Sequence, residues 1–317
     1  MKTRPRSSLL SVVDRSFVRF GAVFIAVLAF EAGIFAATPA DIYQDMESGK
    51  DGDLLTPEIM NASSHGGGST WSLRGSMWVS TKNSRKLPGP VIVDGKTYPG
   101  TGGTRTWMFN DSNANNSVAC SLAGSYSKIT VACYYTPGVT ITFWNRFDTI
   151  VMAGNQVYAV MQTRGDRNGP YLSAHSRAAD GKSTGSPDWV KVVAGKTYWV
   201  NLHFDGAAGK TSVAVFDPEK GSAQVGETVV SDSTPNSTII RRIDFGRCDN
   251  HGNNPTATTQ SCFDHIVVDY THGAFPLIPL AADPKRPIAP PTAKDGVKQG
   301  IDRIAVEFLG FRGVPCR

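Results

Sequence analysis

GKTYWVNLHFDGAAGKTSVAVFD, residues 195–217, contains two runs in which hydrophobic and polar side chains alternate. Alternation with a period of two is typical of a β-strand that buries one face. Asp205-Gly206 and Ala208-Gly209 stand between the two runs, and dipeptides of this kind favour the backbone angles of tight turns. The segment therefore predicts an antiparallel hairpin.

The same alternation, interrupted by turn residues, occurs over most of the chain. Gly occurs 32 times and Pro 19 times, and before residue 282 no stretch of twelve residues has a convincing helical period. About fourteen short runs within one folded region of this length are typical of two packed sheets. We therefore expect an all-β fold, a two-sheet antiparallel sandwich. The runs are 69–80, 89–99 with its Asp94-Gly95 turn, 105–109, 117–122, 128–135, 139–144, 156–163, 169–175, 188–193, 196–204, 210–216, 223–231, 239–245 and 262–270.

The net charge of +5 is concentrated at the two ends of the chain. Residues 1–36 and 283–317 each contribute +3, which leaves −1 for residues 37–282. A folded body that is close to neutral gives no support for a nucleic-acid partner.

The N-terminal residues resemble an export signal. Five basic residues precede an apolar run from Phe20 to Phe35, and the small residues Ala36 and Ala37 follow it. The run is short for a membrane span. We expect a signal peptide over residues 1–36, cleaved after Ala36, with an uncleaved anchor as the alternative. The mature protein would then be secreted or held in the cell envelope, with no membrane contact apart from this segment.

The remaining chain divides into a sandwich over residues 37–280 and a tail over residues 281–317. The tail begins with a segment rich in Pro and Lys, which cannot build a core and is typical of a linker. It ends in the short apolar stretch IDRIAVEFLGF, for which the sequence indicates no role.

Export would permit disulfides, and the chain has five cysteines. None lies in the CxxC spacing of zinc sites. Cys248 and Cys262 flank a polar loop, and we expect a disulfide between them. Cys120 and Cys133 lie in consecutive predicted strands, where two buried thiols and a bridge are both consistent with the sequence. Cys316 is left over.

Three stretches together resemble a known superfamily. They are the opening IYQDMESGKDGDLLTPEIM, the hairpin quoted above, and a polar loop followed by the closing run CFDHIVVDY. Their order over residues 42–275 is similar to that of the concanavalin-A-like, or laminin-G-like, secreted bacterial domains. The resemblance implies a jelly-roll sandwich. It does not choose a function, because the superfamily includes lectin modules, glycoside hydrolases, polysaccharide lyases and adhesive domains.

Two enzyme classes of this fold can be tested against the residues. Retaining glucanases need two carboxylates about 5 Å apart on one strand, and no pattern such as E-x-D-x-x-E is present. Polysaccharide lyases need a Tyr or His base and an Arg, Gln or Asn that neutralises a uronate carboxylate. The candidates for a lyase site are Gln162, Tyr171, His175, Arg247 and His251. The expected His two residues after Gln162 is missing, and Cys248 stands where the alginate-lyase branch has a Tyr.

Carbohydrate binding without catalysis needs aromatic planes for sugar rings, and amides for their hydroxyl groups. Among six tryptophans, Trp71 and Trp107 are preferred because glycine-rich stretches lie beside them and leave room for a ligand. The densest polar cluster consists of Asn250, His251, Asn253 and Asn254, and an Asn-rich turn without ligand is the alternative for it.

The resemblance also implies a calcium ion, which would tie the first strand of the sandwich to the last. Calcium prefers six to eight oxygen ligands. The expected ligands are Glu47 and Asp264, with Asp45 and Asp269 as further candidates; solvated turn residues are the alternative.

We therefore predict an extracytoplasmic jelly-roll domain that binds carbohydrate or a cell-surface polymer without catalysis. A polysaccharide lyase acting on a uronate polymer is the first alternative, and a structural envelope protein is the second.

Overall fold

A computed structural model describes ten segments of the chain: residues 38–87, 90–98, 103–110, 116–138, 146–154, 157–166, 169–178, 183–232, 239–248 and 260–278. The predicted signal segment, the predicted strand over residues 139–144 and the tail lie outside these segments. Within them, no helix has the length and apolarity needed to cross a membrane.

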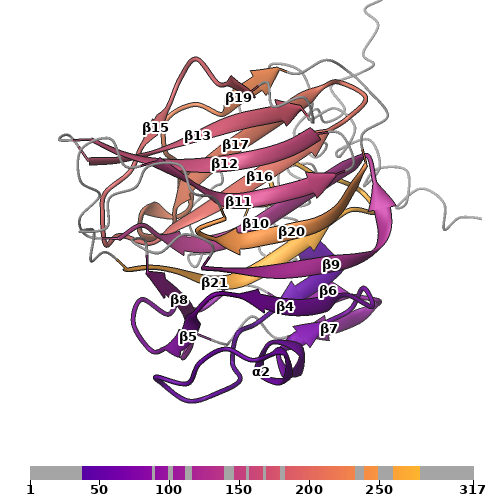
Figure 1. The fold of residues 1–317 in the computed structure, drawn as a ribbon, viewed down its shortest axis with the longest axis vertical. Helices are drawn as coiled ribbons and strands as arrows, with labels where there is room; N and C mark the ends of the chain where they lie inside the picture. Colours follow the sequence, from indigo (N-terminus) through magenta and orange to yellow (C-terminus); the bar gives the residue numbers. More distant parts are fainter. Residues whose placement is uncertain are drawn as a thin grey trace, which may run out of the picture. The chain divides into compact units, whose positions relative to one another are not determined.

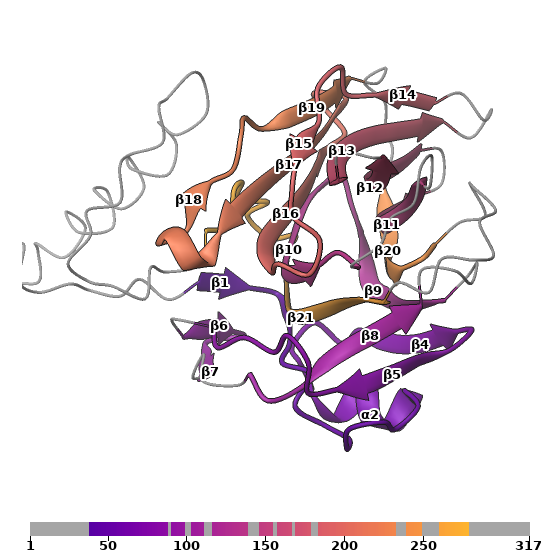
Figure 2. The same cartoon turned by 90° about the vertical axis from the view of Figure 1, so that its left-hand side faces the viewer.

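Two antiparallel sheets form the sandwich (Figures 1 and 2). We call the sheet with the order β14-β13-β12-β11-β20-β9-β4, in which β15 also pairs with β13, the front sheet. Its strands are β4 (Thr70–Arg74), β9 (Ser117–Tyr126), β11 (Arg146–Gly154), β12 (Val157–Asp166), β13 (Gly169–Ala178), β14 (Ser183–Gly185), β15 (Val190–Lys191) and β20 (Ile240–Gly246).

The back sheet has the order β18-β17-β16-β10-β21-β2-β3; in addition, β19 pairs with β17, β8 pairs with β21, and β5 pairs with β8. Its strands are β2 (Ile42–Gln44), β3 (Ser64–His65), β5 (Met77–Ser80), β8 (Thr106–Asn110), β10 (Lys128–Thr136), β16 (Tyr198–Asp205), β17 (Lys210–Asp217), β18 (Ala223–Gln224), β19 (Val229–Asp232) and β21 (Gln260–Asp269). The predicted all-β antiparallel jelly-roll sandwich is confirmed.

Three smaller elements lie outside the two main sheets. A small sheet consists of β1 (Thr38–Ala40), β6 (Val91–Val93) and β7 (Lys96–Tyr98), in which β1 and β6 are parallel. The helix α2 (Pro57–Ala62) begins at Thr56, whose side chain accepts a hydrogen bond from the Ile59 amide, and has Pro57 in its first turn, where its missing N–H costs nothing. A single 3₁₀ turn, η1 (Pro218–Lys220), follows β17.

Two predicted turns are confirmed, and one predicted strand is wrong. β16 and β17 pair as a hairpin through Asp205 and Lys210, and Asp94 and Gly95, both with positive φ, connect β6 to β7. The predicted run 69–80 is instead two strands, because Gly75 adopts a φ of +73°. The chain turns there from β4 in the front sheet to β5 in the back sheet.

The core between the sheets follows from the alternation of side chains. Phe147, Met161, Leu172 and Phe245 of the front sheet are buried with Val131, Leu202 and Val213 of the back sheet in one hydrophobic cluster. Burial on this scale contributes about 25 cal/mol per Å² of apolar surface. A second cluster, which includes Tyr43, Tyr134, Trp199 and Leu277, lies on the other side of the back sheet. That face is therefore covered by the chain itself.

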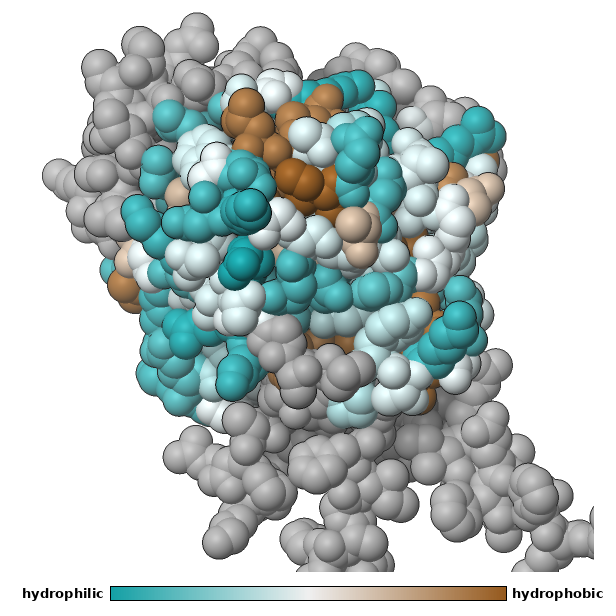
Figure 3. Space-filling view, turned by 90° about the horizontal axis from the view of Figure 1, so that it is seen from below, coloured by the Kyte–Doolittle hydropathy of each residue, from teal (hydrophilic) through white to brown (hydrophobic). Residues whose placement is uncertain are grey.

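Hydrophilic side chains dominate the described surface. In Figure 3, the face seen from below is mostly hydrophilic, with a limited group of hydrophobic residues. Among the described residues, the exposed large hydrophobic side chains are Leu54, Ile92, Tyr158 and Val193, on four separate elements or loops.

Candidate functional site

The outer face of the front sheet carries polar side chains at regular intervals. Because Phe147, Met161 and Ala174 point into the core, their neighbours along β11, β12 and β13 point outward. Register places Asp148 opposite Gln162 and Gln162 opposite Ser173. We call this surface the polar face.

A hydrogen-bonded pair lies at the centre of the polar face. Gln162 Nε2 donates to Asp148 Oδ1 at 3.1 Å, and both side chains are buried. The Gln162 Oε1 atom has no hydrogen-bond partner in the described part of the chain. A buried oxygen without a hydrogen-bond partner costs free energy of folding.

His175 lies beside this pair on β13. Its Nε2 atom is 3.0 Å from Ser173 Oγ, and its cross-strand partner is Gly185. A Cβ at Gly185 would lie 2.7 Å from the His175 Cε1 atom. The absence of a side chain at Gly185 therefore gives the imidazole its room.

Trp189 is the aromatic residue of the polar face. The next residue, Val190, is in the core, so Trp189 points outward. Its ring lies 6.0 Å from the His175 ring in an edge-to-face arrangement, and the Arg164 guanidinium lies over it at 5.0 Å from the centroid. The indole is half-buried. It is thus oriented by two neighbours and still partly accessible.

A row of basic residues crosses the same face. Register aligns Arg146 with Arg164, Arg164 with Tyr171, and Tyr171 with Lys191. Arg146 and Lys191 are exposed. The row therefore carries three positive side chains and one phenol.

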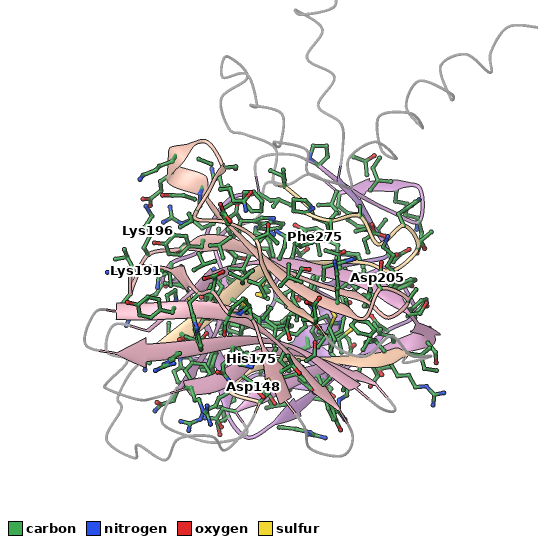
Figure 4. The ribbon with its side chains drawn as sticks, turned by 90° about the horizontal axis from the view of Figure 1, so that it is seen from above. Asp148, His175, Lys191, Lys196, Asp205 and Phe275 are labelled. Carbon is green, nitrogen blue, oxygen red and sulfur yellow. The ribbon has the colours of Figure 1, made fainter. Side chains whose placement is uncertain are left out.

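An ion pair occupies the opposite end of the polar face. Arg242 donates through Nε and Nη2 to Asp244 Oδ2 at 3.1 and 3.0 Å. Burial raises the pKa of Asp244, while Arg242 opposes this shift. Figure 4 shows Asp148 and His175 on the front-sheet strands, with Lys191 toward the edge of the sheet.

The lyase candidates are brought together only in part. Gln162, Tyr171 and His175 share the polar face. Tyr171 and His175 are four residues apart on one strand, about 13 Å at 3.3 Å per residue. Arg247 does not join them: it is fully buried, and its guanidinium lies 5.9 Å from the Phe147 ring in the core. The prediction for Arg247 is wrong in this respect, because its side chain points toward the core rather than the polar face.

The prediction that Trp71 and Trp107 stack on a ligand is wrong. Both rings are buried in the core cluster, 5.4 Å apart and edge to face. Trp71 Nε1 donates to Ser64 Oγ at 2.9 Å. Adjacent glycines did not indicate exposure, because they serve the backbone turns of these segments instead. Asn250, His251, Asn253 and Asn254 lie outside the described residues.

Sequence reasoning missed Trp189, although a signal for it was present. Val190 and Val192 alternate with Trp189 and Lys191, and a strand with two buried valines places the residues between them on the opposite face. The Ser186 amide donates to the Ala174 carbonyl at 2.8 Å, and this bond holds the preceding segment against β13.

The predicted disulfide between Cys248 and Cys262 is wrong, since both are present as thiols. Cys248 follows β20 of the front sheet, and its Sγ lies 3.9 Å from the Thr149 carbonyl oxygen. Cys262 belongs to β21 of the back sheet, where Asn83 Nδ2 contacts it at 3.7 Å. Cys120 and Cys133 are buried thiols, and burial raises the pKa of Cys120 to about 12.

The four carboxylates expected to bind calcium do not form one ligand set. Asp269 accepts backbone hydrogen bonds from His272 and Ala274, and Asp45 Oδ2 pairs with His65 at 2.8 Å. Glu47 accepts the amides of Gly103 and Thr104. No cluster of three or more metal-binding side chains occurs in the described segments.

Of the four, Asp264 is the one with an oxygen that lacks a hydrogen-bond partner among the described residues. Asp264 is fully buried, and burial raises its pKa, with the Glu47 charge adding to the shift. The calcium prediction rests on these two residues alone and stays a prediction.

His265, next to Asp264, is part of a buried network. Its Nε2 lies 2.9 Å from the Arg85 carbonyl oxygen, which can only accept, so Nε2 carries the proton. Nδ1 then accepts from the Tyr43 hydroxyl at 2.8 Å. The residue has a φ of +46° inside a strand, beside the register shift of β21 against β10, and backbone of this kind is strained.

No protein-family model matches the chain, and no curated protein matches it. Solved structures show distant likenesses. The binding domain of botulinum neurotoxin serotype D is 11% identical at a TM-score of 0.37, over 62% of this chain and 43% of that one. The chain thus spans less than half the length of that neurotoxin domain.

Two smaller structures align over almost their whole length. The cellulose-induced protein Cip1 is 12% identical at a TM-score of 0.38, over 72% of this chain and 97% of that one. Basic winged bean lectin, solved with the Tn antigen, is 9% identical at a TM-score of 0.33, over 63% of this chain and 97% of that one. Likenesses this distant support no conclusion about the function of this chain.

Proposed function

We propose that the protein binds carbohydrate on the polar face without catalysis. The observation that carries the proposal is Trp189: a partly exposed indole, held by Arg164 and His175, on the same face as Tyr171 and Gln162. Sugar rings pack their C–H faces on such an indole, and their hydroxyl groups bond to the partly exposed imidazole of His175 and phenol of Tyr171 on the same face.

The arrangement suits recognition better than proton transfer. A lyase base and its partner acid must both reach one sugar residue, whereas Tyr171 and His175 are about 13 Å apart along β13. Arg247, the candidate for neutralising a uronate carboxylate, lies in the core. The polar face offers hydrogen-bonding groups spread over several strands, as an extended polymer requires.

A polysaccharide lyase is the second candidate, because Gln162, Ser173 and His175 are neighbours on adjacent strands. A Gln that neutralises a carboxylate and a His base could act from these positions on a uronate polymer. The export signal predicted for residues 1–36 would place either function outside the cytoplasm, in the medium or the cell envelope.

One experiment separates the candidates. The purified protein is applied to a glycan array, and it is also incubated with uronate polymers while absorbance from an unsaturated product is followed. Retention without product supports the binding function. A rise in absorbance that is lost in His175→Ala would establish the lyase instead. Silence in both assays would leave the structural envelope role.

A further inference from the structure

From the charges of the polar face, we infer that its ligand is an anionic polysaccharide, one whose sugars carry carboxylate or sulfate groups. This inference rests on the proposed function, and it adds the chemical class of the ligand. The inference does not rest on Trp189, because an indole binds the ring of a neutral sugar as well as that of a charged one.

The first observation is the sign of the charges. Among strand residues of this face whose side chains are described, the basic ones are Arg74, Arg146, Arg164, Lys191 and Arg242, and the acidic ones are Asp148 and Asp244. Both acids are almost completely buried. Even with the exposed Asp188 of the adjoining loop counted, the face is positive, although residues 37–282 have a net charge of −1.

The second observation is the placement of the basic residues. Arg146, Arg164 and Lys191 lie in one register row that crosses β11, β12, β13 and β15. Three steps of about 4.8 Å give the row a length of about 14 Å. Such a row can contact successive charged groups of a polymer lying across the strands.

The third observation is the chemistry of the row. Two of its three cations are the arginines Arg146 and Arg164, directly opposite each other on neighbouring strands. Guanidinium groups bind carboxylate and sulfate oxygens through paired hydrogen bonds. The row therefore suits acidic sugars.

The uncharged side chains around the row favour a sugar polymer over a nucleic acid. Tyr171 belongs to the row itself, and His175 lies on the same strand and face; both are partly exposed. These groups can bond to hydroxyl groups between the charged substituents of a polysaccharide.

The test uses the full chain and the variant Arg146→Gln/Lys191→Gln, which leaves Trp189 and Arg164 unchanged. Its control, Lys82→Gln/Lys220→Gln, removes the same charge at exposed positions beside the back sheet. Affinities are measured for polygalacturonate, dextran sulfate, neutral dextran and single-stranded DNA at two salt concentrations. The first two ligands distinguish carboxylate from sulfate.

We expect the protein to bind one of the anionic polysaccharides at least tenfold more tightly than neutral dextran. Its affinity for that polysaccharide should fall about tenfold in Arg146→Gln/Lys191→Gln and stay unchanged in the control variant. Binding to neutral glycans alone would overturn the inference and leave the proposed function standing. No binding to any polysaccharide would overturn both. Equal or tighter binding to DNA, or equal losses in both variants, would also overturn the inference.

Discussion

The guanidinium carbon of Arg164 lies 5.0 Å from the centroid of the Trp189 ring. A cation over an indole face is attracted by the ring electrons and contributes about 0.5–1 kcal/mol at a partly exposed site. The two residues belong to different segments, β12 and the loop before β15, so their contact ties the edge of the front sheet to its interior. The polar face thus has a fixed aromatic surface.

Gly185→Ala should disturb the polar face through His175. The new Cβ would lie 2.7 Å from His175 Cε1, so the imidazole must shift, and its edge-to-face contact with Trp189 changes with it. We expect several-fold weaker glycan binding, measured by calorimetry, with a free energy of unfolding within about 1 kcal/mol of wild type. Combined with His175→Ala, the substitution should have little further effect, because the two changes act through one contact. Additive losses would contradict this coupling.

Trp71 and Trp107 should both behave as core residues, but only the replacement of Trp71 should break a hydrogen bond. Trp71 Nε1 donates to Ser64 Oγ, whereas Trp107 Nε1 has no partner among the described residues. Trp71→Phe should therefore lower the free energy of unfolding by about 1 kcal/mol more than Trp107→Phe. Urea denaturation measures both. If either variant kept its stability and lost glycan binding, the assignment of that ring to the core would be wrong.

Stability should fall in mild acid because of His203. Burial, with Lys128 nearby, lowers the pKa of this imidazole to about 4, and its Nδ1 lies 2.8 Å from Thr130 Oγ1. The folded pKa is below the unfolded value of about 6.5, so the unfolded chain binds more protons between the two. The contribution of neutral His203 is complete above pH 6.5 and is lost as the pH falls toward 4, by up to about 3 kcal/mol.

The measurement is the free energy of unfolding of wild type and His203→Gln at pH 7 and pH 4.5. Gln can keep a hydrogen bond to Thr130 and does not titrate. We expect the free energy of unfolding of the variant, relative to that of wild type, to be higher at pH 4.5 than at pH 7. Parallel pH profiles would show that His203 does not titrate in this range.

Calcium, if it binds as predicted at Glu47 and Asp264, should stabilise the fold. A ligand at one hundred times its Kd adds about 2.7 kcal/mol. Chelator should then lower the melting temperature, and Glu47→Gln and Asp264→Asn should lose the response, while Asp232→Asn at an exposed strand end keeps it. A melting temperature that ignores both chelator and added calcium would exclude this ion and leave Asp264 as a buried carboxyl group.

The fold could be predicted because each hydrophobic run follows a period of two, and turn residues mark most of its ends. The 195–217 hairpin and the Asp94-Gly95 turn are examples. The division of 69–80 could not be predicted, since nothing in the alternation of that run indicates a change of sheet. It depends on the tertiary position of Gly75.

The site was less predictable for a physical reason. The alternation of Trp189 with Val190 and Val192 was a usable signal, whereas the glycines beside Trp71 and Trp107 were a misleading one, because they do not report on which face of a strand a ring lies. Of the lyase candidates, Gln162, Tyr171 and His175 lie on one face of the front sheet, whereas Arg247 follows the end of β20 and turns inward. The partner strands of Arg146 and Lys191, which create the basic row, depend on pairing that the sequence does not specify.

Trp189→Ala tests the central claim most directly. Wild-type protein and the variant are compared by retention on the same glycan array and by thermal unfolding, with Trp78→Ala on β5 as a second half-buried tryptophan away from the polar face. We predict that wild type and Trp78→Ala are retained, and that Trp189→Ala loses retention while it unfolds within a few degrees of wild type. Undiminished retention of a folded Trp189→Ala protein would contradict the assignment of the polar face as the carbohydrate site.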